Sequence, residues 1–126
     1  GVAIVPDLED VRLPGKDAVS YIILLNELIT NALKHAFVEG EGGQIRVRLR
    51  EAVSDERPCV RIEVEDDGRG LPGGEVASGL GQKILRSLLT SMGGTLAQEP
   101  VHASAARPGL RSILIVPRPS PSVSAA

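Results

Sequence analysis

The chain has 126 residues, with 14 basic and 16 acidic side chains, no tryptophan and a single cysteine. This length suits one compact domain, and the near-neutral charge, without a basic run or interleaved aromatics, argues against nucleic-acid binding. One cysteine forms neither a disulfide framework nor a cysteine-based metal site, which favours a reducing compartment, the cytoplasm. No apolar run is long enough to span a bilayer, and the chain opens at Gly1 without Met. We therefore expect a piece of a longer protein, with any membrane segment or sensory module outside it.

The first part of the chain combines extended and helical patterns. Residues 1–5 and 11–13 are typical of short strands, and Pro14 with Gly15 separates them from a helix predicted over 17–36. The apolar residues that recur near helical spacing and predict its buried face are Val19, Ile22, Ile23, Leu25, Ile29, Ala32, Leu33 and Ala36. The glycine-rich stretch 40–43 ends this helical pattern.

One stripe of this helix is polar. Glu27, Asn31 and His35 follow one another at intervals of one turn, and Lys34 lies one turn beyond Asn31, so all four share one side of the helix. A face that simply meets water has the same pattern. The composition, however, is that of a polyphosphate site, with an amide for hydrated Mg²⁺, an ammonium for phosphate charge and a carboxylate to accept a proton.

Two strands with period-two alternation follow. Residues 44–50 alternate apolar and mostly basic side chains, and residues 59–65 alternate apolar and charged ones. The polar loop 54–58 predicts a hairpin between them, which places the arginines of the first strand across from Glu63 and Glu65. We interpret this arginine row as structural.

Asp66 follows the second of these strands in the inward phase of its apolar residues. A carboxylate on the core side of a sheet needs a donor, because a buried unpaired charge is costly, and a ligand amine is one such donor. Gly68 and Gly70 remove side chains where the backbone turns, which permits positive φ or the close approach of a flat ligand. A plain Asp-Gly turn between strands shows the same isolated motif, so the rest of the chain decides between them.

The second helix is predicted from apolar residues at helical spacing and ends in the manner of a glycine C-cap at Gly93 and Gly94. Its apolar residues are Leu80, Ile84, Leu85, Leu88 and Met92. Gly79 and Gly81 frame its start, where unpaired N–H groups and the helix dipole favour an anion such as phosphate. An ordinary turn into a helix has the same pattern. It is not a dinucleotide-binding fingerprint, because no strand leads directly into it and the third glycine is missing.

The remaining segments are two closing strands, at 95–98 and 111–116, and a tail rich in Pro, Ser and Ala. The predicted order is β-β-α-β-β-α-β-β. This order favours an α/β fold, a two-layer sandwich with helices on one face of a mixed, mainly antiparallel sheet.

Taken in order, the polar helix stripe, Asp66 to Gly70 and Gly79 to Gly81 resemble the asparagine box and the two glycine boxes of the histidine-kinase-like ATPase superfamily, which has the Bergerat ATP-binding fold. Residues 26–37 and 65–72 look most like the catalytic domain of a bacterial two-component sensor histidine kinase. The Glu-Leu-Ile-Thr-Asn form of the first box points to the branch related to the HWE kinases, and the absence of tryptophan points to a sister group. The resemblance implies a catalytic domain over 1–117, with 118–126 as a disordered tail or linker.

The resemblance also implies roles for individual residues. Asn31 would ligate Mg²⁺, and Asp66 would bond the adenine amino group. Lys34 and His35 would approach the phosphates of ATP, and Glu27 would orient or deprotonate the attacking nucleophile. The further positions implied for nucleotide binding are Gly68, Gly70, Gly79, Leu80 and Gly81.

The activity implied is transfer of the γ-phosphoryl group of Mg-ATP to a phosphoacceptor histidine on a dimerisation domain outside this chain. That domain would form the homodimer of the full-length protein and pass the phosphoryl group to a response regulator receiver domain. Neither His35 nor His102 is expected to be the phosphorylated residue. Two alternatives remain open, a serine kinase of the anti-sigma-factor kind and a non-catalytic interaction or phosphotransfer module on the same fold.

Some residues depart from the pattern of the superfamily. The lid segment 71–78 is short and lacks phenylalanine, and Ala77 stands where the second glycine box usually begins. Gln82 occupies a position where an apolar residue is common, and Leu110 follows Gly109 where relatives often carry threonine. These departures bear on lid closure and nucleotide affinity but not on the fold.

Overall fold

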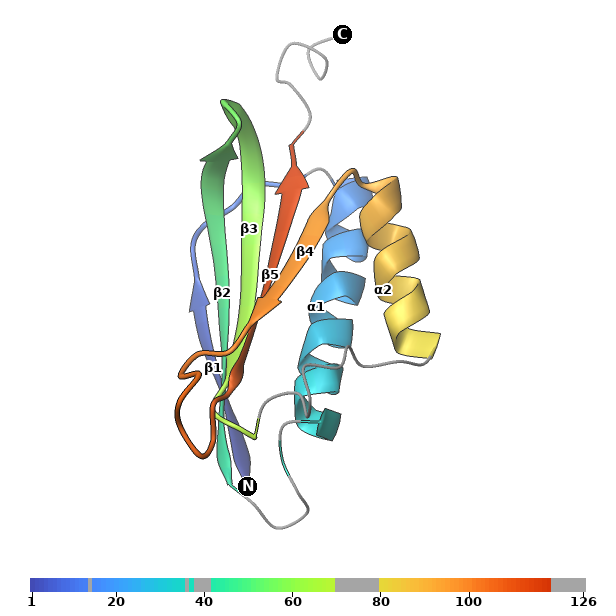
Figure 1. The fold of residues 1–126 in the computed structure, drawn as a ribbon. Coiled ribbons are helices and arrows are strands. Elements are labelled where there is room, and N and C mark those ends of the chain that lie inside the picture. Colours follow the sequence, from blue (N-terminus) through green and yellow to red (C-terminus); the bar gives the residue numbers. More distant parts are fainter. Residues whose placement is uncertain (14, 36, 38–41, 70–79, 119–126) are drawn as a thin grey trace, which may run out of the picture.

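The computed structural model describes residues 1–13, 15–35, 37, 42–69 and 80–118, without the side chains of residues 16, 35 and 80. Its elements in chain order are β1 (Val2–Leu8), α1 (Gly15–His35), β2 (Gly43–Ser54), β3 (Arg57–Asp66), α2 (Leu80–Ser91), β4 (Thr95–Glu99) and β5 (Leu110–Pro117). Five strands form one sheet in the order β1-β2-β3-β5-β4, with β1 parallel to β2 and the other neighbours antiparallel. Both helices lie on the same face of this sheet (Figure 1). The predicted two-layer α/β sandwich is therefore confirmed.

The hydrophobic core fills the space between the helices and the sheet. The side chains that are almost fully buried are Leu24, Ile45, Val60, Ile62, Leu85, Leu114 and Val116. The predicted buried face of α1 is correct in part, because Ala32 is buried and Leu25 and Ile29 pack against the core. It was wrong for Val19 and Ile22, which are 60% and 63% exposed, and it did not include the buried Leu24 and Leu28. Aliphatic side chains surround this helix, so spacing alone does not identify the side that meets the sheet. Neither described helix has the length and apolarity needed to cross a bilayer.

The expected strand at 11–13 does not form, and this prediction was wrong. A strand needs a neighbour with free backbone groups, and the pairing of this part of the chain with β2 ends where the Glu9 N–H donates to the Leu49 carbonyl over 3.0 Å. Val11 and Leu13 nevertheless pack against the core. Their alternation with exposed Arg12 thus reflects an irregular segment with one buried side.

The two predicted turns form, one of them more tightly than expected. The β2–β3 hairpin closes through Asp55 and Glu56 alone, with φ of 52° and 64°, so the loop is shorter than the predicted 54–58. Two residues at positive φ match the right-handed twist of the paired strands. The predicted cap of α2 also forms, because Gly93 has φ of 69° and the Gly94 N–H donates to the Leu89 carbonyl over 2.9 Å.

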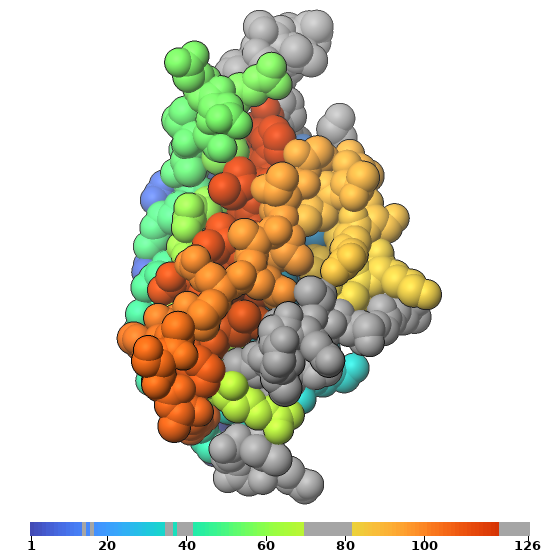
Figure 2. All heavy atoms as spheres, in the orientation of Figure 1, coloured from blue at the N-terminus to red at the C-terminus, as the bar shows by residue number. Residues whose placement is uncertain are grey.

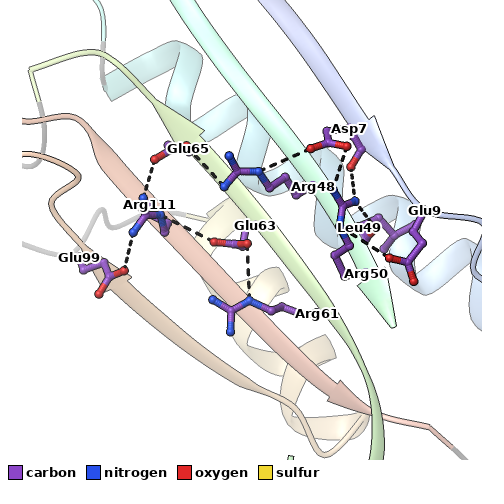
Figure 3. Close-up of polar contacts among 10 residues, drawn as sticks. All are labelled: Asp7, Glu9, Arg48, Leu49, Arg50, Arg61, Glu63, Glu65, Glu99 and Arg111. Carbon is purple, nitrogen blue, oxygen red and sulfur yellow. Dashed lines mark hydrogen bonds and ion pairs between the residues drawn. The ribbon is translucent and has the colours of Figure 1, made fainter. Parts of the chain in front are cut away.

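Charged side chains cover the sheet face opposite the helices (Figure 3). Arg48 lies between Asp7, at 3.7 Å, and Glu65, at 3.9 Å, as the predicted hairpin partly requires. Arg50, in contrast, pairs with Asp7 at 2.8 Å on β1, because its partner position on β3 is another arginine. These pairs are partly exposed and individually weak. The row agrees with its predicted structural role.

The chain leaves β5 through a residue that is anchored to the domain. The Arg118 N–H donates to the Pro58 carbonyl over 3.0 Å, and its guanidinium contacts Glu51 and the Arg12 carbonyl. The remainder of the predicted tail, residues 119–126, lies outside the described residues.

Candidate functional site

Asp66 is the last residue of β3 and is buried, with 4% of its surface exposed, in line with Val60, Ile62 and Val64. The inward phase predicted for this carboxylate is confirmed. The Gly68 N–H donates to its Oδ1 over 2.9 Å, and the Leu110 N–H provides a further backbone hydrogen bond. Two backbone donors therefore orient a carboxylate at the point where the strand ends.

A second loop packs directly on this strand end. Gly109 has φ of 67°, and its N–H donates to the Gly68 carbonyl over 2.9 Å. A Cβ atom at Gly109 would lie 2.4 Å from the backbone oxygen of Asp66. In Figure 2 the segment 100–109, in deep orange, forms a lobe beside the yellow-green end of β3. The position of Asp66 thus depends on Gly109, a glycine far along the chain that lies outside the predicted site.

Asp67 joins the strand end to the start of β2. Its Oδ1 accepts the Gln44 N–H over 2.8 Å, and its own N–H donates to the Gln44 carbonyl over 3.2 Å. Phe37 is buried beside Gly43, where an added Cβ would lie only 2.3 Å from its ring. The Arg107 guanidinium lies 5.9 Å from the centre of the same ring. These contacts hold three loops together around the end of β3.

The helix α1 ends at the same end of the domain as β3 (Figure 1). The polar stripe belongs to the second half of this helix. Glu27 and Asn31 are half-buried, and Lys34 is exposed. The Asn31 Nδ2 atom is buried and has no hydrogen-bond partner among the described residues. A buried amide donor without an acceptor is costly, so this group is suited to an acceptor that arrives with a ligand.

Part of the predicted site falls outside the described residues. Gly70, Gly79 and the lid 71–78 are not described, and neither is the side chain of His35. Leu80 and Gly81 form the first residues of α2, as the prediction of a helix start there requires. The first turn of α2 also contains Gln82, a buried polar residue that is not among the predicted site residues.

Burial makes the Asp66 carboxyl group a weaker acid than an exposed aspartate. Desolvation raises the pKa of its carboxyl above the ordinary 3.8, against the opposing effect of the hydrogen bonds from Gly68 and Leu110. The nearby charges of Asp67 and Glu65 raise the pKa further. The folded state therefore binds the proton more tightly than the unfolded chain does.

This shift predicts a pH effect on stability. The stability that proton binding to Asp66 contributes is fully present below its unfolded pKa and is lost as the pH rises through the higher folded pKa. Relative to Asp66→Asn, which does not titrate, the wild type should therefore lose free energy of unfolding as the pH rises from about 3.8. Urea unfolding of both proteins across this range measures the difference. A difference that stays constant, or that changes in favour of the wild type, contradicts the prediction.

Comparison with known proteins relates this geometry to one family. Residues 16–119 match the family described as histidine kinase-, DNA gyrase B- and HSP90-like ATPases. The chain is 35% identical over 91 residues to blue-light-activated histidine kinase 2 of Erythrobacter litoralis, covering 70% of this chain and 25% of that protein. It is 33% identical over 94 residues to the sensor histidine kinase PdtaS of Mycolicibacterium smegmatis, covering 71% of this chain and 18% of that protein. The chain thus spans a quarter or less of the length of these relatives.

A solved structure agrees with the sequence comparison. The histidine kinase domain of the Erythrobacter litoralis EL346 blue-light activated histidine kinase superposes with a TM-score of 0.73 at 27% identity. The match covers 91% of this chain and 54% of that domain. The similarity therefore includes nearly the whole of the described fold.

Proposed function

Because this chain belongs to the family of histidine kinase-, DNA gyrase B- and HSP90-like ATPases, as an ATP-binding catalytic domain of the histidine-kinase type, we propose that its full-length protein is a sensor histidine kinase. In that protein this domain transfers the γ-phosphoryl group of Mg-ATP to a histidine on a dimerisation domain. The branch related to the HWE kinases fits the similarity to the blue-light-activated kinase.

The observation that carries this proposal is the buried carboxylate of Asp66. Its Oδ1 accepts the Gly68 N–H, which leaves acceptor positions on the carboxylate for a ligand. The exocyclic amine of adenine is a donor of the required kind. A carboxylate that bonds this amine distinguishes adenine from guanine, which carries a carbonyl at the same position.

Mg²⁺ is the metal ion that the proposed reaction needs, and Asn31 fits a role beside it. The amide offers an oxygen, the ligand atom that Mg²⁺ prefers, and its buried Nδ2 lacks an acceptor that a phosphate oxygen can supply. When bound, Mg²⁺ neutralises charge on the phosphates during transfer. The chain itself positions the triphosphate, through Asn31 and through the N–H groups of the first turn of α2.

The other polar residues of α1 complete the proposed mechanism. Lys34 is exposed at the end of the helix, and its ammonium compensates phosphate charge, together with His35. Glu27, one turn before Asn31, orients or deprotonates the imidazole of the phosphoacceptor histidine. The glycines of the two boxes, Gly68, Gly70, Gly79 and Gly81, let the nucleotide approach the backbone, and Leu80 adds a helix-start amide.

We propose the cytoplasm as the location of this domain, because ATP is its substrate. The partners that we propose are the dimerisation domain of the same protein and the receiver domain of a response regulator. The full-length protein is proposed to act as a homodimer through that dimerisation domain.

The proposed magnesium site predicts the behaviour of Asn31→Ala. In the presence of Mg²⁺ this variant should bind a non-hydrolysable ATP analogue about tenfold more weakly than the wild type, because it lacks both the oxygen ligand and the amide donor. Without Mg²⁺ the two proteins should differ less. Calorimetric titration of both proteins with and without Mg²⁺ measures this difference. Asn26→Ala, on an exposed position of the same helix, is the control. If Asn31→Ala loses the same affinity with and without Mg²⁺, Asn31 is not a ligand of the metal.

The phosphotransfer step is tested in the full-length protein. Incubation with ATP labelled in the γ-phosphate should give a protein-bound label that is lost in acid and kept in base, because a phosphoramidate hydrolyses in acid. A label with the opposite stability would identify a phosphoserine and support the serine-kinase alternative. Nucleotide binding without any label would support the non-catalytic module.

A further inference from the structure

The buried face of α2 contains one polar residue. Gln82, Leu85 and Leu89 follow one another at the spacing of one helix side, and they are 7%, 0% and 5% exposed. The Gln82 Oε1 atom is buried and has no hydrogen-bond partner among the described residues. The buried side of α2 therefore contains an amide oxygen that accepts no hydrogen bond from the described residues.

Such an oxygen destabilises the domain by itself. Burial removes its hydrogen bonds to water, and nothing in the described part of the chain replaces them. An aliphatic residue would continue the row of Leu85 and Leu89 without this cost. Glutamine at this position is therefore understandable if a donor reaches the oxygen in another state of the protein.

The position of Gln82 indicates where that donor comes from. The residue lies in the first turn of α2, immediately after the segment in which the glycine box lies. The start of α2 is the end of this helix that lies nearer to the ends of β3 and α1 (Figure 1). Asp66 is the last residue of β3, and Asn31 lies close to the end of α1. We propose that Gln82 completes the nucleotide site and that its Oε1 accepts a hydrogen bond from the nucleoside part of ATP. This inference rests on the proposed function.

The chemistry of ATP narrows the choice of donor. The ionised phosphates carry acceptors only, so the triphosphate cannot satisfy an amide oxygen. The donors of the nucleoside are the exocyclic amine of adenine and the two ribose hydroxyls. Asp66 uses one hydrogen of the amine in the proposed site, which leaves the second hydrogen and the hydroxyls for Gln82.

Gln82→Met tests this inference, because methionine keeps the length of the side chain and lacks the oxygen. We expect nucleotide-free Gln82→Met to unfold at the same or a higher urea concentration than the wild type. Its affinity for a non-hydrolysable ATP analogue with Mg²⁺ should fall about tenfold, the loss expected for one buried hydrogen bond. Arg86→Met, exposed one turn later on the same helix, should match the wild type in affinity.

ATP analogues that lack one donor group each identify the donor that Gln82 binds. Calorimetric titrations compare ATP with purine riboside triphosphate, which lacks the amine, and with the 2′-deoxy and 3′-deoxy forms of ATP. For the analogue that lacks the group bound by Gln82, the wild type and Gln82→Met should bind equally, as in a double-mutant cycle. A loss that is the same for every analogue would show that no nucleoside donor meets Gln82 and would overturn the assignment.

Three further results would also overturn it. If the wild type binds ATP and Gln82→Met binds it equally well, Gln82 does not contact the nucleotide, although the proposed function stands. The same holds if Gln82→Met is less stable and keeps its affinity, since the side chain then has a purely structural role. A folded wild type that binds no nucleotide overturns the proposed function and this inference together.

Discussion

Asp66→Asn is expected to weaken ATP binding by about 100-fold, the largest effect that a single side chain of the proposed site should have. The N–H groups of Gly68 and Leu110 occupy two acceptor positions of the carboxylate, and its two oxygens still offer further acceptor positions to the adenine amine. An amide has a single oxygen, which the two backbone donors engage, so its NH₂ group would meet the amine of adenine, donor against donor. Charge-assisted hydrogen bonding is lost as well.

The comparison needs variants that remain folded. Asp66→Asn retains the shape of the side chain and removes a desolvated charge, so the domain should stay as stable as the wild type at neutral pH. Asp67→Asn makes the same chemical change one residue later, on an exposed side chain whose Oδ1 can still accept the Gln44 N–H. Calorimetric titration with an ATP analogue should therefore show a large loss for Asp66→Asn and little change for Asp67→Asn. Equal affinity of Asp66→Asn and the wild type would exclude Asp66 as the adenine acceptor.

Gly109→Ala is expected to lower the free energy of unfolding by about 2–4 kcal/mol, a large loss for the addition of one methyl group. Alanine is strained at the observed φ of 67°. Its Cβ would also lie 2.4 Å from the Asp66 backbone oxygen, so one of the two loops has to move. Because that oxygen belongs to the residue that binds adenine in the proposed site, ATP affinity should fall too.

Gly15→Ala is the matched control, since a Cβ atom there meets no heavy atom of the described residues within 4 Å. At the start of α1 alanine is a better helix residue than glycine, so this variant should be as stable as the wild type or more stable. Urea unfolding with equal m-values measures both changes. A Gly109→Ala domain as stable as the wild type would show that the 100–109 segment adjusts freely and that Asp66 does not depend on it.

The candidate site divides into residues that the sequence could reveal and residues that it could not. Asp66 was recognised because its phase follows from the strand before it, and Asn31 because its stripe follows from helical spacing. Gln82 and Gly109 are not among the predicted site residues. Gln82 only departs from the pattern of the superfamily, and Gly109 only precedes another such departure, Leu110. A helical pattern through Leu85 and Leu89 does extend back to Gln82, which was a signal that could have placed it on the buried face. No signal in the sequence brought Gly109 to Asp66, because their contact joins two loops that are distant along the chain.

The sequence by itself determined the features that depend on near neighbours. Alternation along β2 and β3, the inward phase of Asp66 and the glycine cap of α2 all follow from the geometry of a single strand or helix and were confirmed.

Only the tertiary structure decided which side of α1 is buried, that Val11 to Leu13 form no strand, that Arg50 pairs with β1, and that Gly109 packs on Asp66. Each of these depends on where a distant segment lies. The physical reason is that burial and strand pairing each involve two elements. A pattern within one element indicates that it needs a partner, but it does not indicate which segment of the chain packs or pairs with it.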